Sequence, residues 1–546
     1  MKQNKILFTI AIVFLEIFHS NAQFKVTDYG AVGDGKKINT AYIQKAIDDC
    51  HNKGGGTVDF PSGIFLSGAI RLKSNVYLNL DKCAELLGVA DYTYYPELEH
   101  SIKAYSIGYS ARVFIFAQDV ENIGIIGSGV VNGNGNHPNF ATFSETITIK
   151  TRPYLIRFVR CKKVNVEGVT IKNGAYWLQH YLACSDVRLI NLDIDAMEQH
   201  NNDGIDIDAC DNVLISGCNI KSEDDGICFK STTGIPCKNI TVTNCVIYSS
   251  CNGIKFGTES NAGFQNITIS NCVIDNPNKY IDFSNHQNLN HPNPYKRRIK
   301  NGFANGIAGI AIEVVDGGVI DNINISNIVI NDINSPIFIR LGNRARKYKE
   351  DMPIPGLSTL KNVIISGVTI KSSSPISSSI TGLPGNNIEN IKISNVIYNI
   401  KSFDTEKLNY KIPELPKDYP TAEMFGELPS SGFYIRHVKG ITFDNVQFLN
   451  TKKDLKPIFF LDDVVNGEFR NITFNTALKE STFGLRNSSN IVISNCFSDK
   501  TNNYLVGDFE GNEKIYVKQN VLSGYKQISN FQNKSQLIEI DNILRR

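Results

Sequence analysis

A repeat of nearly constant length dominates this sequence. The phrase CKKVNVEGVTIKN begins at position 161, and related phrases begin at 184, 210, 237 and 264. Further copies begin at 320, 360 and 388, with weaker ones at 438 and 488. The first five starts are 23, 26, 27 and 27 residues apart, and later gaps of 56 and 50 residues fit two repeats each. Periods of roughly 20–50 residues indicate a repeat architecture in which each unit packs against its neighbours.

Each copy consists of a short run of β-branched residues, a glycine or asparagine, and a second short run. The alternation is that of strands, the turn residues favour bends, and helical spacing is absent from the copies. Three short strands and three turns in roughly 20–30 residues make one coil of a parallel β-helix. The sequence therefore predicts an all-β protein folded as a right-handed parallel β-helix.

Residues 39–50, NTAYIQKAIDDC, predict one short helix ahead of the repeats. Four apolar residues recur there at helical spacing after Asn39, a favourable N-cap residue. Such a helix covers the open end of a solenoid, which needs a cap. We therefore expect an N-terminal cap over about residues 23–80. The four apolar residues are Ile43, Ala46, Ile47 and Cys50.

Seven of the 12 cysteines recur in register with the repeats. Stacked, inward-pointing cysteines behave as small buried hydrophobic side chains. No CxxC pair occurs, so we expect no metal site and no cofactor, while disulfides within a stack remain an alternative. One set of cysteines is Cys161, Cys184, Cys210 and Cys237, and the other is Cys218, Cys245 and Cys272.

Residues 1–22 predict a secretory signal peptide. Two lysines precede an apolar run, and Ser20 and Ala22 suit cleavage after residue 22. The run is too short for a membrane span and is interrupted by Glu16, and no later stretch reaches 18 apolar residues. We expect residues 23–546 to form a single catalytic domain that is exported to the periplasm or the medium.

The charge balance and two long loops bear on the partner. A formal net charge of +2 without a basic block argues against nucleic acid. Residues 276–302 and 399–431 break the period and are rich in Asn, Pro and charge, which predicts loops. Loops of this length in a compact scaffold usually serve a site. Nothing in the sequence predicts the oligomeric state.

Three aspartates recur at the interval of one coil. Asp203 stands in NNDG, and Asp224 and Asp225 stand in EDDG. A coil of this length would place all three on neighbouring rungs of one face, within several Å of one another. Like charges at that range raise at least one pKa, so a protonated acid can coexist with an ionised base. Glycoside hydrolysis needs such a pair.

Other roles for acidic residues have to be weighed. We interpret Asp206, Asp208 and Asp211 as turn residues that bond the backbone or stack in ladders. Calcium binding is an alternative for the acidic cluster, because β-helix lyases use calcium with a basic residue for proton abstraction. A polysaccharide lyase and a non-catalytic carbohydrate-binding β-helix are therefore the competing functions. Three mutually repelling acids have no use in a binding module.

At these residues the sequence resembles glycoside hydrolase family 28, the polygalacturonases and their relatives. Asn201-Asn202-Asp203 matches the family's Asn-Thr-Asp motif, and Asp224-Asp225 matches its Asp-Asp motif at the same interval. The resemblance covers most of the chain after residue 22, beginning with FKVTDYGAVGDGKKINTAYIQKAIDDC. It implies a pectin-lyase-like solenoid and a pectic, galacturonate-containing polysaccharide or oligosaccharide as substrate.

The resemblance also implies hydrolysis with inversion. Asp224 would protonate the glycosidic oxygen, while Asp203 and Asp225 would activate water on the opposite face. Inverting enzymes hold their two carboxyl groups roughly 6.5–9.5 Å apart, against about 5–5.5 Å in retaining enzymes. The spacing of β-helix rungs, about 4.8 Å, is nearer the smaller value, so inversion rests on the family alone.

Two family motifs are broken. Asn252 stands where the Gly-His-Gly motif has histidine, and GIAIEVVDGG offers Ala311 and Glu313 in place of the Arg and Lys of Arg-Ile-Lys. In the family that Arg and Lys are thought to bind the substrate's carboxylate, and Glu313 would repel it. Either other cations bind the uronate, or the sugar at the cleavage point is neutral or substituted.

Several side chains are candidates for binding the substrate. The cations that could replace the missing motif are Lys230, Lys255, Arg340 and Arg344, with a solvated strand end as the alternative for the arginines. Period-2 alternation leaves the direction of Lys255 open, because it puts that side chain opposite Asn252. The other candidates are Asn201, Asn252, Trp177 and His180, for which burial in the core is the alternative.

Residues 417–440 resemble a loop of bacterial family members. That loop would bring aromatic or cationic side chains near the sugar, whereas an ordinary strand is the alternative for part of it. The candidates within the loop are Phe425, Tyr434, Arg436 and His437.

Overall fold

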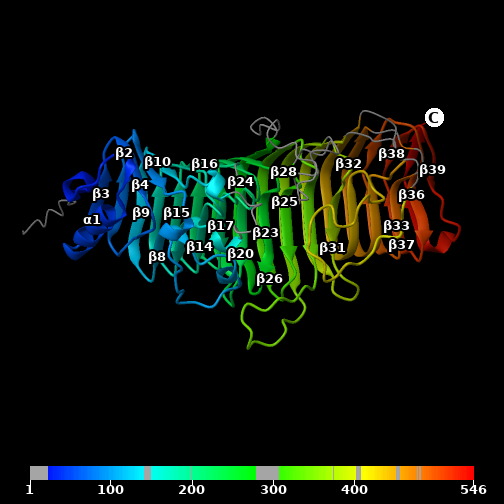
Figure 1. The fold of residues 1–546 in the computed structure, drawn as a ribbon. Coiled ribbons are helices and arrows are strands. Elements are labelled where there is room, and N and C mark those ends of the chain that lie inside the picture. Colours follow the sequence, from blue (N-terminus) through cyan, green and yellow to red (C-terminus); the bar gives the residue numbers. More distant parts are fainter. Residues whose placement is uncertain are drawn as a thin grey trace, which may run out of the picture.

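The computed structural model describes residues 23–140, 149–197, 199–277, 306–372, 374–400, 408–450, 455–475, 478 and 481–545. These residues form a long rod with helix α1 (Thr40–Asn52) at one end and the last strands at the other (Figure 1). The predicted signal peptide lies outside the described residues, as does most of the predicted 276–302 loop.

Within the described ranges, every strand-to-strand pairing is parallel and joins one coil to the next. The predicted right-handed parallel β-helix is confirmed. Its strands stack into three sheets that run the length of the rod (Figure 1). Because consecutive coils align strand on strand, a residue's position within its coil decides which sheet it joins.

The first sheet contains β1 (Gln23–Lys25), β3 (Gly56–Phe60), β6 (Val76–Leu80), β9 (Glu121–Gly127), β12 (Lys162–Glu167), β15 (Ser185–Ile190), β18 (Asp211–Ser216), β21 (Cys237–Thr243), β34 (Ser489–Ser494), β37 (Glu513–Lys518) and β40 (Leu537–Ile540). The second sheet contains β2 (Asp34–Ile38), β4 (Gly63–Ser67), β7 (Ala84–Gly88), β10 (Val130–Asn132), β13 (Thr170–Lys172), β16 (Asp193–Ala196), β19 (Asn219–Ser222), β22 (Val246–Ser249), β35 (Phe497–Ser498), β38 (Val521–Ser523) and β41 (Ile543–Arg545). Four strands bend from the first sheet into the second: β24 (Gly263–Asp275), β26 (Val319–Asn331), β28 (Thr359–Ser372) and β30 (Ile388–Ile400).

The third sheet carries the acidic residues. It contains β5 (Ile70–Arg71), β8 (Val113–Gln118), β11 (Tyr154–Val159), β14 (Gln179–Leu182), β17 (Ile205–Asp208), β20 (Ile227–Ser231), β23 (Asn252–Ser260), β25 (Ala308–Val314), β27 (Ser335–Leu341), β29 (Ser378–Thr381), β33 (Ser481–Arg486), β36 (Asn502–Glu510) and β39 (Tyr525–Ser529). Two long strands, β31 (Phe433–Asn450) and β32 (Phe459–Asn475), pass through all three sheets. Short 3-10 turns occur at Val26–Tyr29, Tyr92–Tyr94, Tyr105–Gly108, Pro138–Phe140, Ile149–Thr151 and Lys534–Gln536.

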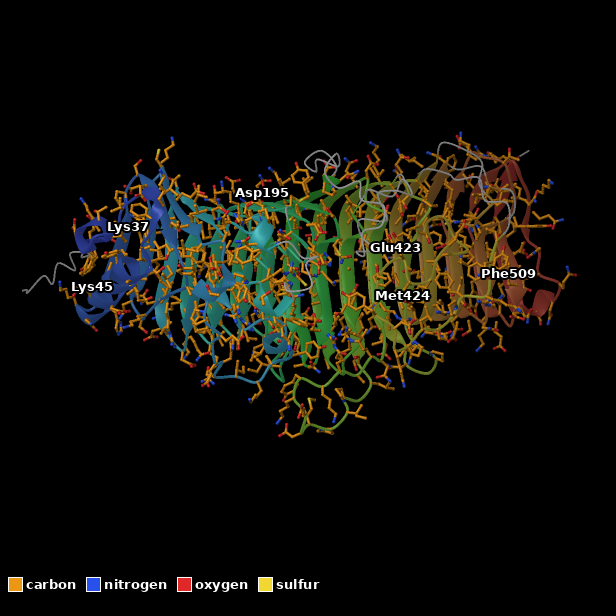
Figure 2. The ribbon with its side chains drawn as sticks, in the orientation of Figure 1. Lys37, Lys45, Asp195, Glu423, Met424 and Phe509 are labelled. Atoms are coloured by element: carbon orange, nitrogen blue, oxygen red, sulfur yellow. The ribbon has the colours of Figure 1, made fainter. Side chains whose placement is uncertain are left out.

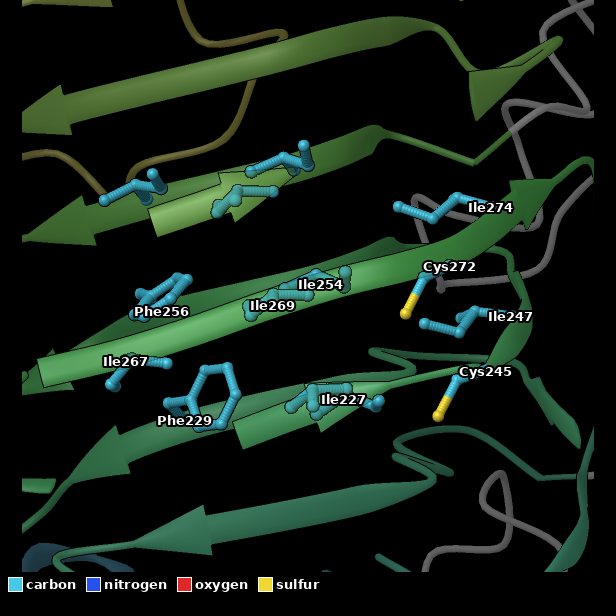
Figure 3. Close-up of a cluster of buried hydrophobic side chains, with 14 of the residues drawn as sticks. Ile227, Phe229, Cys245, Ile247, Ile254, Phe256, Ile267, Ile269, Cys272 and Ile274 are labelled. Atoms are coloured by element: carbon cyan, nitrogen blue, oxygen red, sulfur yellow. The ribbon is translucent and has the colours of Figure 1, made fainter. Parts of the chain in front are cut away.

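The interior is filled by columns of like side chains. Ile227 pairs with Ile254 on the next coil, and both are fully buried (Figure 3). Cys245 and Cys272 point inward nearby and are also buried, as predicted for the cysteine stacks. All 12 cysteines are free thiols, so the stacks contain no disulfide. Stacked β-branched side chains pack well on pleated strands, which explains why the repeat favours this interior.

Asparagines turn the corners between strands. The asparagine in successive copies of the repeat has a positive φ, near 55–60°, which asparagine tolerates better than most residues. Each also donates a side-chain hydrogen bond to the coil before it; Asn266, for example, donates to Asn239 over 3.1 Å. The asparagines of this ladder are Asn212, Asn239, Asn266, Asn322, Asn362 and Asn390.

The predicted capping helix is present as α1, and its four predicted apolar residues are fully buried. Asn39 stands at the N-cap position, but its side chain makes no capping hydrogen bond. It bonds instead the backbone of Val32 and Lys37, which fixes the chain that enters the helix. Within the described ranges, no helix combines the length and apolarity that crossing a membrane requires.

The second predicted loop, residues 399–431, is described from residue 408 onward. Residues 408–431, named here the strap, contain no strand and lie against the outside of the third sheet. Its residues Glu423 and Met424 are labelled in Figure 2, over the part of the rod where Figure 1 labels β31.

Candidate active site

Two turns of the third sheet stack to bring the predicted acids together. Ile205, the first residue of β17, pairs with Ile227, the first residue of β20. Asp203 and Asp225 each stand two residues before these paired isoleucines. Each is followed by glycine, and the Gly204 amide donates to the Asp225 carbonyl oxygen over 2.9 Å. A Cβ atom on Gly204 would lie 2.7 Å from the carbonyl oxygen of Gly226, so a larger residue would push the turns apart. Asn252 holds the same place in the next turn.

Asp225 is held by two donors. Asn252 Nδ2 donates to its Oδ1 over 2.7 Å, and the Lys255 ammonium donates to its Oδ2 over 2.9 Å. Burial of Asp225, which is only 2% exposed, would raise its pKa. The charges of Lys255 and Lys230 and these hydrogen bonds outweigh burial, so the pKa of Asp225 lies below aspartate's ordinary value. Asp225 is therefore ionised under ordinary conditions.

Asp224 has the opposite character. Burial raises its pKa above aspartate's ordinary value, and the charges of Asp225 and Glu223 add to the shift. Its Oδ2 accepts a hydrogen bond of 3.3 Å from Asn201 Nδ2. Arg152 in turn donates to the side-chain oxygen of Asn201, which fixes the amide orientation. As the pH falls, Asp224 therefore takes up a proton before Asp225 does.

Asp203 lies deepest in the cluster. Its pKa is raised well above aspartate's ordinary value by burial, then by Asp206 and Asp224. One of its oxygens, Oδ1, has no hydrogen-bond partner in the structure, and the other lies 3.7 Å from the Lys230 ammonium. A buried oxygen without a partner is costly, so this position favours an incoming hydrogen-bond donor such as water.

Asp206 belongs to this cluster, which corrects its interpretation as a turn residue. It lies within β17, is fully buried, and has an oxygen 3.4 Å from the Lys230 ammonium. Burial raises the pKa of Asp206 to about 8 despite that cation. Asp208 two residues later does have a structural role, because it accepts hydrogen bonds from Thr232. Alternation alone could not separate the two aspartates.

Two of the four candidate cations, Lys230 and Lys255, reach the acids, and their role in binding the substrate stays a prediction. The Lys230 ammonium lies between Asp203, Asp206 and Glu259, and 4.4 Å from the centre of the Trp177 ring. Lys255 points to Asp225, the carboxylate that Asn252 also bonds, although period-2 alternation along β23 would place the two side chains on opposite faces.

The two arginine candidates are engaged elsewhere. Arg340 is 1% exposed, and its guanidinium donates to backbone carbonyl oxygens of the strap, at Glu414 and Leu415. The prediction that Arg340 binds substrate is therefore wrong for this structure. Arg344 donates to Asp316 through Nε and Nη2 and to Thr258 through Nη1 and Nη2, and it remains only partly buried. Its role in binding remains a prediction.

The aromatic candidates lie at different depths. Trp177 is 5% exposed and packs against Tyr109, Tyr154 and Tyr176, with its face turned to Lys230. His180 has no exposed surface, and its Nε2 lies 3.0 Å from Asp208 Oδ2. Burial lowers the pKa of His180 to about 4, so the ring is neutral at neutral pH. Direct substrate contact by His180 is thereby contradicted.

The broken family motif has a structural explanation. Ala311 pairs with Lys255 on the neighbouring strand and packs against the strap, where a long cationic side chain would find no space. Glu313 is 1% exposed, and burial raises its pKa to about 8, so its carboxyl group is largely protonated at neutral pH. It then adds no negative charge to the site.

The loop candidates of the sequence are buried beneath the strap or within it. Phe425 packs in the apolar cluster between the strap and the third sheet, and Tyr434 has no exposed surface. Arg436 and His437 are nearly buried and bond strap residues. The strap residue that reaches the acids is Tyr419, which sequence reasoning missed because the path of a loop leaves no periodic signal.

A metal ion would find one possible set of ligands in the described part of the chain. One oxygen each of Asp224 and Asp225 and the sulfur of Cys251 lie within 4.8 Å of one another. Both oxygens of Asp225 already accept hydrogen bonds, from Asn252 and Lys255. An ammonium group at this position competes directly with a cation, so the donor set fits a metal poorly.

Comparison with known proteins supports the resemblance. Residues 50–281 match the family described as Glycosyl hydrolases family 28. A probable polygalacturonase of Vitis vinifera is 29% identical over 216 residues, 38% of this chain and 44% of its own. An exo-poly-alpha-D-galacturonosidase of Dickeya chrysanthemi is 39% identical over 120 residues, 20% of this chain and 19% of its own. The matches thus span less than half the length of these relatives.

Solved structures show the same fold. A hyperthermoactive exopolygalacturonase from Thermotoga maritima superposes with a TM-score of 0.55 at 22% identity, covering 69% of this chain and 87% of its own. A polygalacturonase from Erwinia carotovora ssp. carotovora gives 0.52 at 19% identity, covering 69% and 93%. Residues 50–281, which include all three predicted acids, are thus similar to glycosyl hydrolases family 28, and the solved structures share the parallel β-helix fold.

Proposed function

We propose that the protein is a glycoside hydrolase that cleaves O-glycosidic bonds of a galacturonate-containing polysaccharide or oligosaccharide with inversion. The observation that carries this proposal is the pair Asp224 and Asp225. Their nearest oxygens lie within 4.8 Å, yet their pKa values shift in opposite directions. A protonated acid beside an ionised base is what hydrolysis of a glycosidic bond requires.

The roles follow from the charges. Asp224 gives its proton to the glycosidic oxygen as the bond to the anomeric carbon breaks. Water attacks that carbon from the other side, and its proton passes to Asp225, which is ionised because Lys255 stabilises the charge. Asp203, whose Oδ1 lacks a partner, accepts a hydrogen bond from the same water. Asp203 contributes less to proton removal, because its raised pKa keeps it protonated in the empty site.

Inversion is the part of the proposal that the short distance does not favour. Retaining enzymes hold the carboxyl groups about 5–5.5 Å apart, close to what is found here. However, both oxygens of Asp225 are tied by hydrogen bonds to Asn252 and Lys255, which suits a base that orients water better than a free nucleophile. The family resemblance supports inversion as well.

A neutral or substituted sugar is a second candidate substrate, favoured by one observation. Four of the described cations around the acids are ion-paired within the protein, which leaves these four less available to a uronate carboxylate. The pairs are Lys230 with Asp203, Asp206 and Glu259, Lys255 with Asp225, Arg344 with Asp316, and Arg346 with Glu259. Export to a place where such polysaccharides occur accords with the signal peptide predicted for residues 1–22 and is part of this proposal.

Product analysis tests the proposal. The protein is incubated with polygalacturonate, branched pectin and neutral pectic polysaccharides, with and without a chelator. We expect new reducing ends without ultraviolet absorbance, no effect of the chelator, and a loss of at least ~100-fold in Asp224→Asn. Asp193→Asn, an exposed aspartate of the second sheet, serves as the control and should keep full activity. Unsaturated products would show a lyase, and no products from any substrate would show a binding protein.

A further inference from the structure

The strap is fixed to the β-helix by three arginines of one row. Arg340, Arg436 and Arg486 occupy the same row of the third sheet, on β27, β31 and β33, as the strand pairings show. Each guanidinium donates to backbone carbonyl oxygens of the strap. The acceptors are Glu414 and Leu415 for Arg340, Ile412 and Pro413 for Arg436, and Tyr410 for Arg486.

Apolar packing holds the strap between these anchors and the acids. A cluster separate from the interior forms where strap side chains meet the outward face of the third sheet. The sheet contributes Cys251, Ala308, Ala311, Phe338, Tyr434 and Phe460, and the strap contributes Ile412, Ala422, Phe425 and Leu428. All are at least nine-tenths buried, so the strap has a single defined path over the sheet.

This path places one aromatic side chain of the strap, Tyr419, next to the acids. Tyr419 is 51% exposed and stands at the end of an exposed stretch of the strap, residues 416–419. Its hydroxyl accepts a hydrogen bond of 3.3 Å from the Lys255 ammonium, which also donates to Asp225. The Lys255 nitrogen lies 5.7 Å and the Arg344 guanidinium 6.0 Å from the ring centre. Lys255 thus links the half-exposed Tyr419 ring to Asp225, the proposed base, through two hydrogen bonds.

We infer that Tyr419 is a substrate-contacting residue that the strap presents to the sugar bound beside Asp225. A ring that is apolar on its face and polar at its tip suits a pyranose, whose C–H groups pack on the face while its hydroxyls bond nearby polar groups. The hydrogen bond from Lys255 fixes the tip of the Tyr419 side chain beside Asp225 while about half of its surface stays exposed, which leaves ring surface for a sugar. This inference rests on the proposed function, because it needs a sugar at the acids.

Two variants of Tyr419 separate substrate contact from a purely internal role. Tyr419→Ala removes the ring, and we expect KM for trigalacturonate, or for whichever substrate the wild type hydrolyses in the panel, to rise about tenfold. Tyr419→Phe keeps the ring and loses only the bond to Lys255, so KM should stay within about threefold of wild type. Tyr94→Ala, another exposed tyrosine far along the chain, is the control and should change nothing.

The outcomes distinguish this inference from the function on which it rests. If the wild type hydrolyses a substrate but Tyr419→Ala binds it equally well, Tyr419 does not contact sugar and the inference is overturned. It is also overturned if Phe and Ala raise KM equally, because the hydroxyl would then act only through Lys255. Failure of the proposed function appears separately, as absence of hydrolysis by the wild type. Since Tyr419 is exposed, both variants should melt at the wild-type temperature, which confirms that they fold.

Discussion

The third sheet carries two polar regions that differ in how their charges are satisfied. From Asp203, which precedes β17, to Glu313 on β25, the outward face holds a cluster of six buried or half-buried acids. Only some of them meet a cation, and oxygens of Asp203 and Asp206 lack hydrogen-bond partners. From β27 to β33, the same face holds three arginines whose guanidinium groups donate to the strap. The acids are Asp203, Asp206, Asp224, Asp225, Glu259 and Glu313.

This difference assigns the arginine region a role in stability and the acidic region a role in catalysis. The arginine region is covered by the strap, and the terminal guanidinium nitrogens of its three arginines meet acceptors, although Arg436 Nε has none. In the acidic region, several of the close carboxyl groups have raised pKa values and some of their oxygens lack hydrogen-bond partners. Such unfavourable arrangements persist in proteins where a functional site requires them. Mutations in the acidic region should therefore change activity first, whereas mutations in the arginine region should change stability first.

The largest expected effect is on activity in the acidic region. Asp225→Asn removes the proposed base, and we expect kcat to fall by at least ~100-fold on the preferred substrate. The loss should exceed any change in KM, because an asparagine can still bond Lys255 and Asn252. Initial-rate kinetics measure both constants, with Asp193→Asn as the control. Activity within tenfold of wild type would remove Asp225 from the mechanism and erase the functional contrast between the regions.

The second effect is on stability in the arginine region. Arg436→Met removes two hydrogen bonds to the carbonyl oxygens of Ile412 and Pro413, and we expect the free energy of unfolding to fall by roughly 2–4 kcal/mol. The denaturant midpoint measures this loss. Arg470→Met breaks ion pairs that are half-exposed on another face and should cost less than about 1 kcal/mol. Equal losses in the two variants would mean that the strap is not anchored by the row of arginines.

The third effect is on the pH dependence of activity. Lys255 lowers the pKa of Asp225, so Lys255→Met should raise that pKa and move the acidic limb of kcat/KM upward by roughly one to three pH units. The basic limb, which reports loss of the proton on Asp224, should move less. Lys238→Met, which removes a surface partner of Asp211, is the matched control. An unmoved acidic limb would show that the ionisation of Asp225 does not limit the reaction.

The smallest effect concerns the pH dependence of stability. The pKa of Glu313 is about 8 in the folded protein and near 4.5 when unfolded, so between these values the folded state holds the extra proton. Stability then falls as pH rises through that range. Glu313→Gln should reduce the drop in melting temperature between pH 5 and pH 8 by on the order of a degree or two. An unchanged drop would mean that Glu313 ionises normally; the exposed Glu121→Gln provides the reference.

The fold and the centre of the site could be predicted because both depend on the repeat length. Counting one coil from Asp203 arrives at Asp225, and the strand pairings place these residues in one column. The cysteine stacks follow from the same count. The burial of individual side chains could not be derived from the repeat length. His180 and Trp177 are both near the acids, but contact with Asp208 decides how far His180 is buried, and packing against tyrosines decides this for Trp177.

Residues outside the repeat could not be placed from the sequence. Tyr419 reaches Lys255 only because arginines far apart in the chain hold the strap, and no local pattern encodes such contacts. The direction of Lys255 could not be derived from alternation, because Asn252 and Lys255 stand three residues apart on β23 and yet both bond Asp225. Asp206 looked like a turn residue because its role depends on Lys230 from the next coil.

The configuration of the first product tests the central claim most directly. The claim is that Asp224, protonated, and Asp225, ionised, act on opposite sides of one glycosidic bond with water between base and sugar. Proton NMR during the first minutes of hydrolysis records the anomer before it equilibrates in water. The account predicts the inverted anomer. The retained anomer would contradict it, because retention requires a carboxylate to attack the sugar itself.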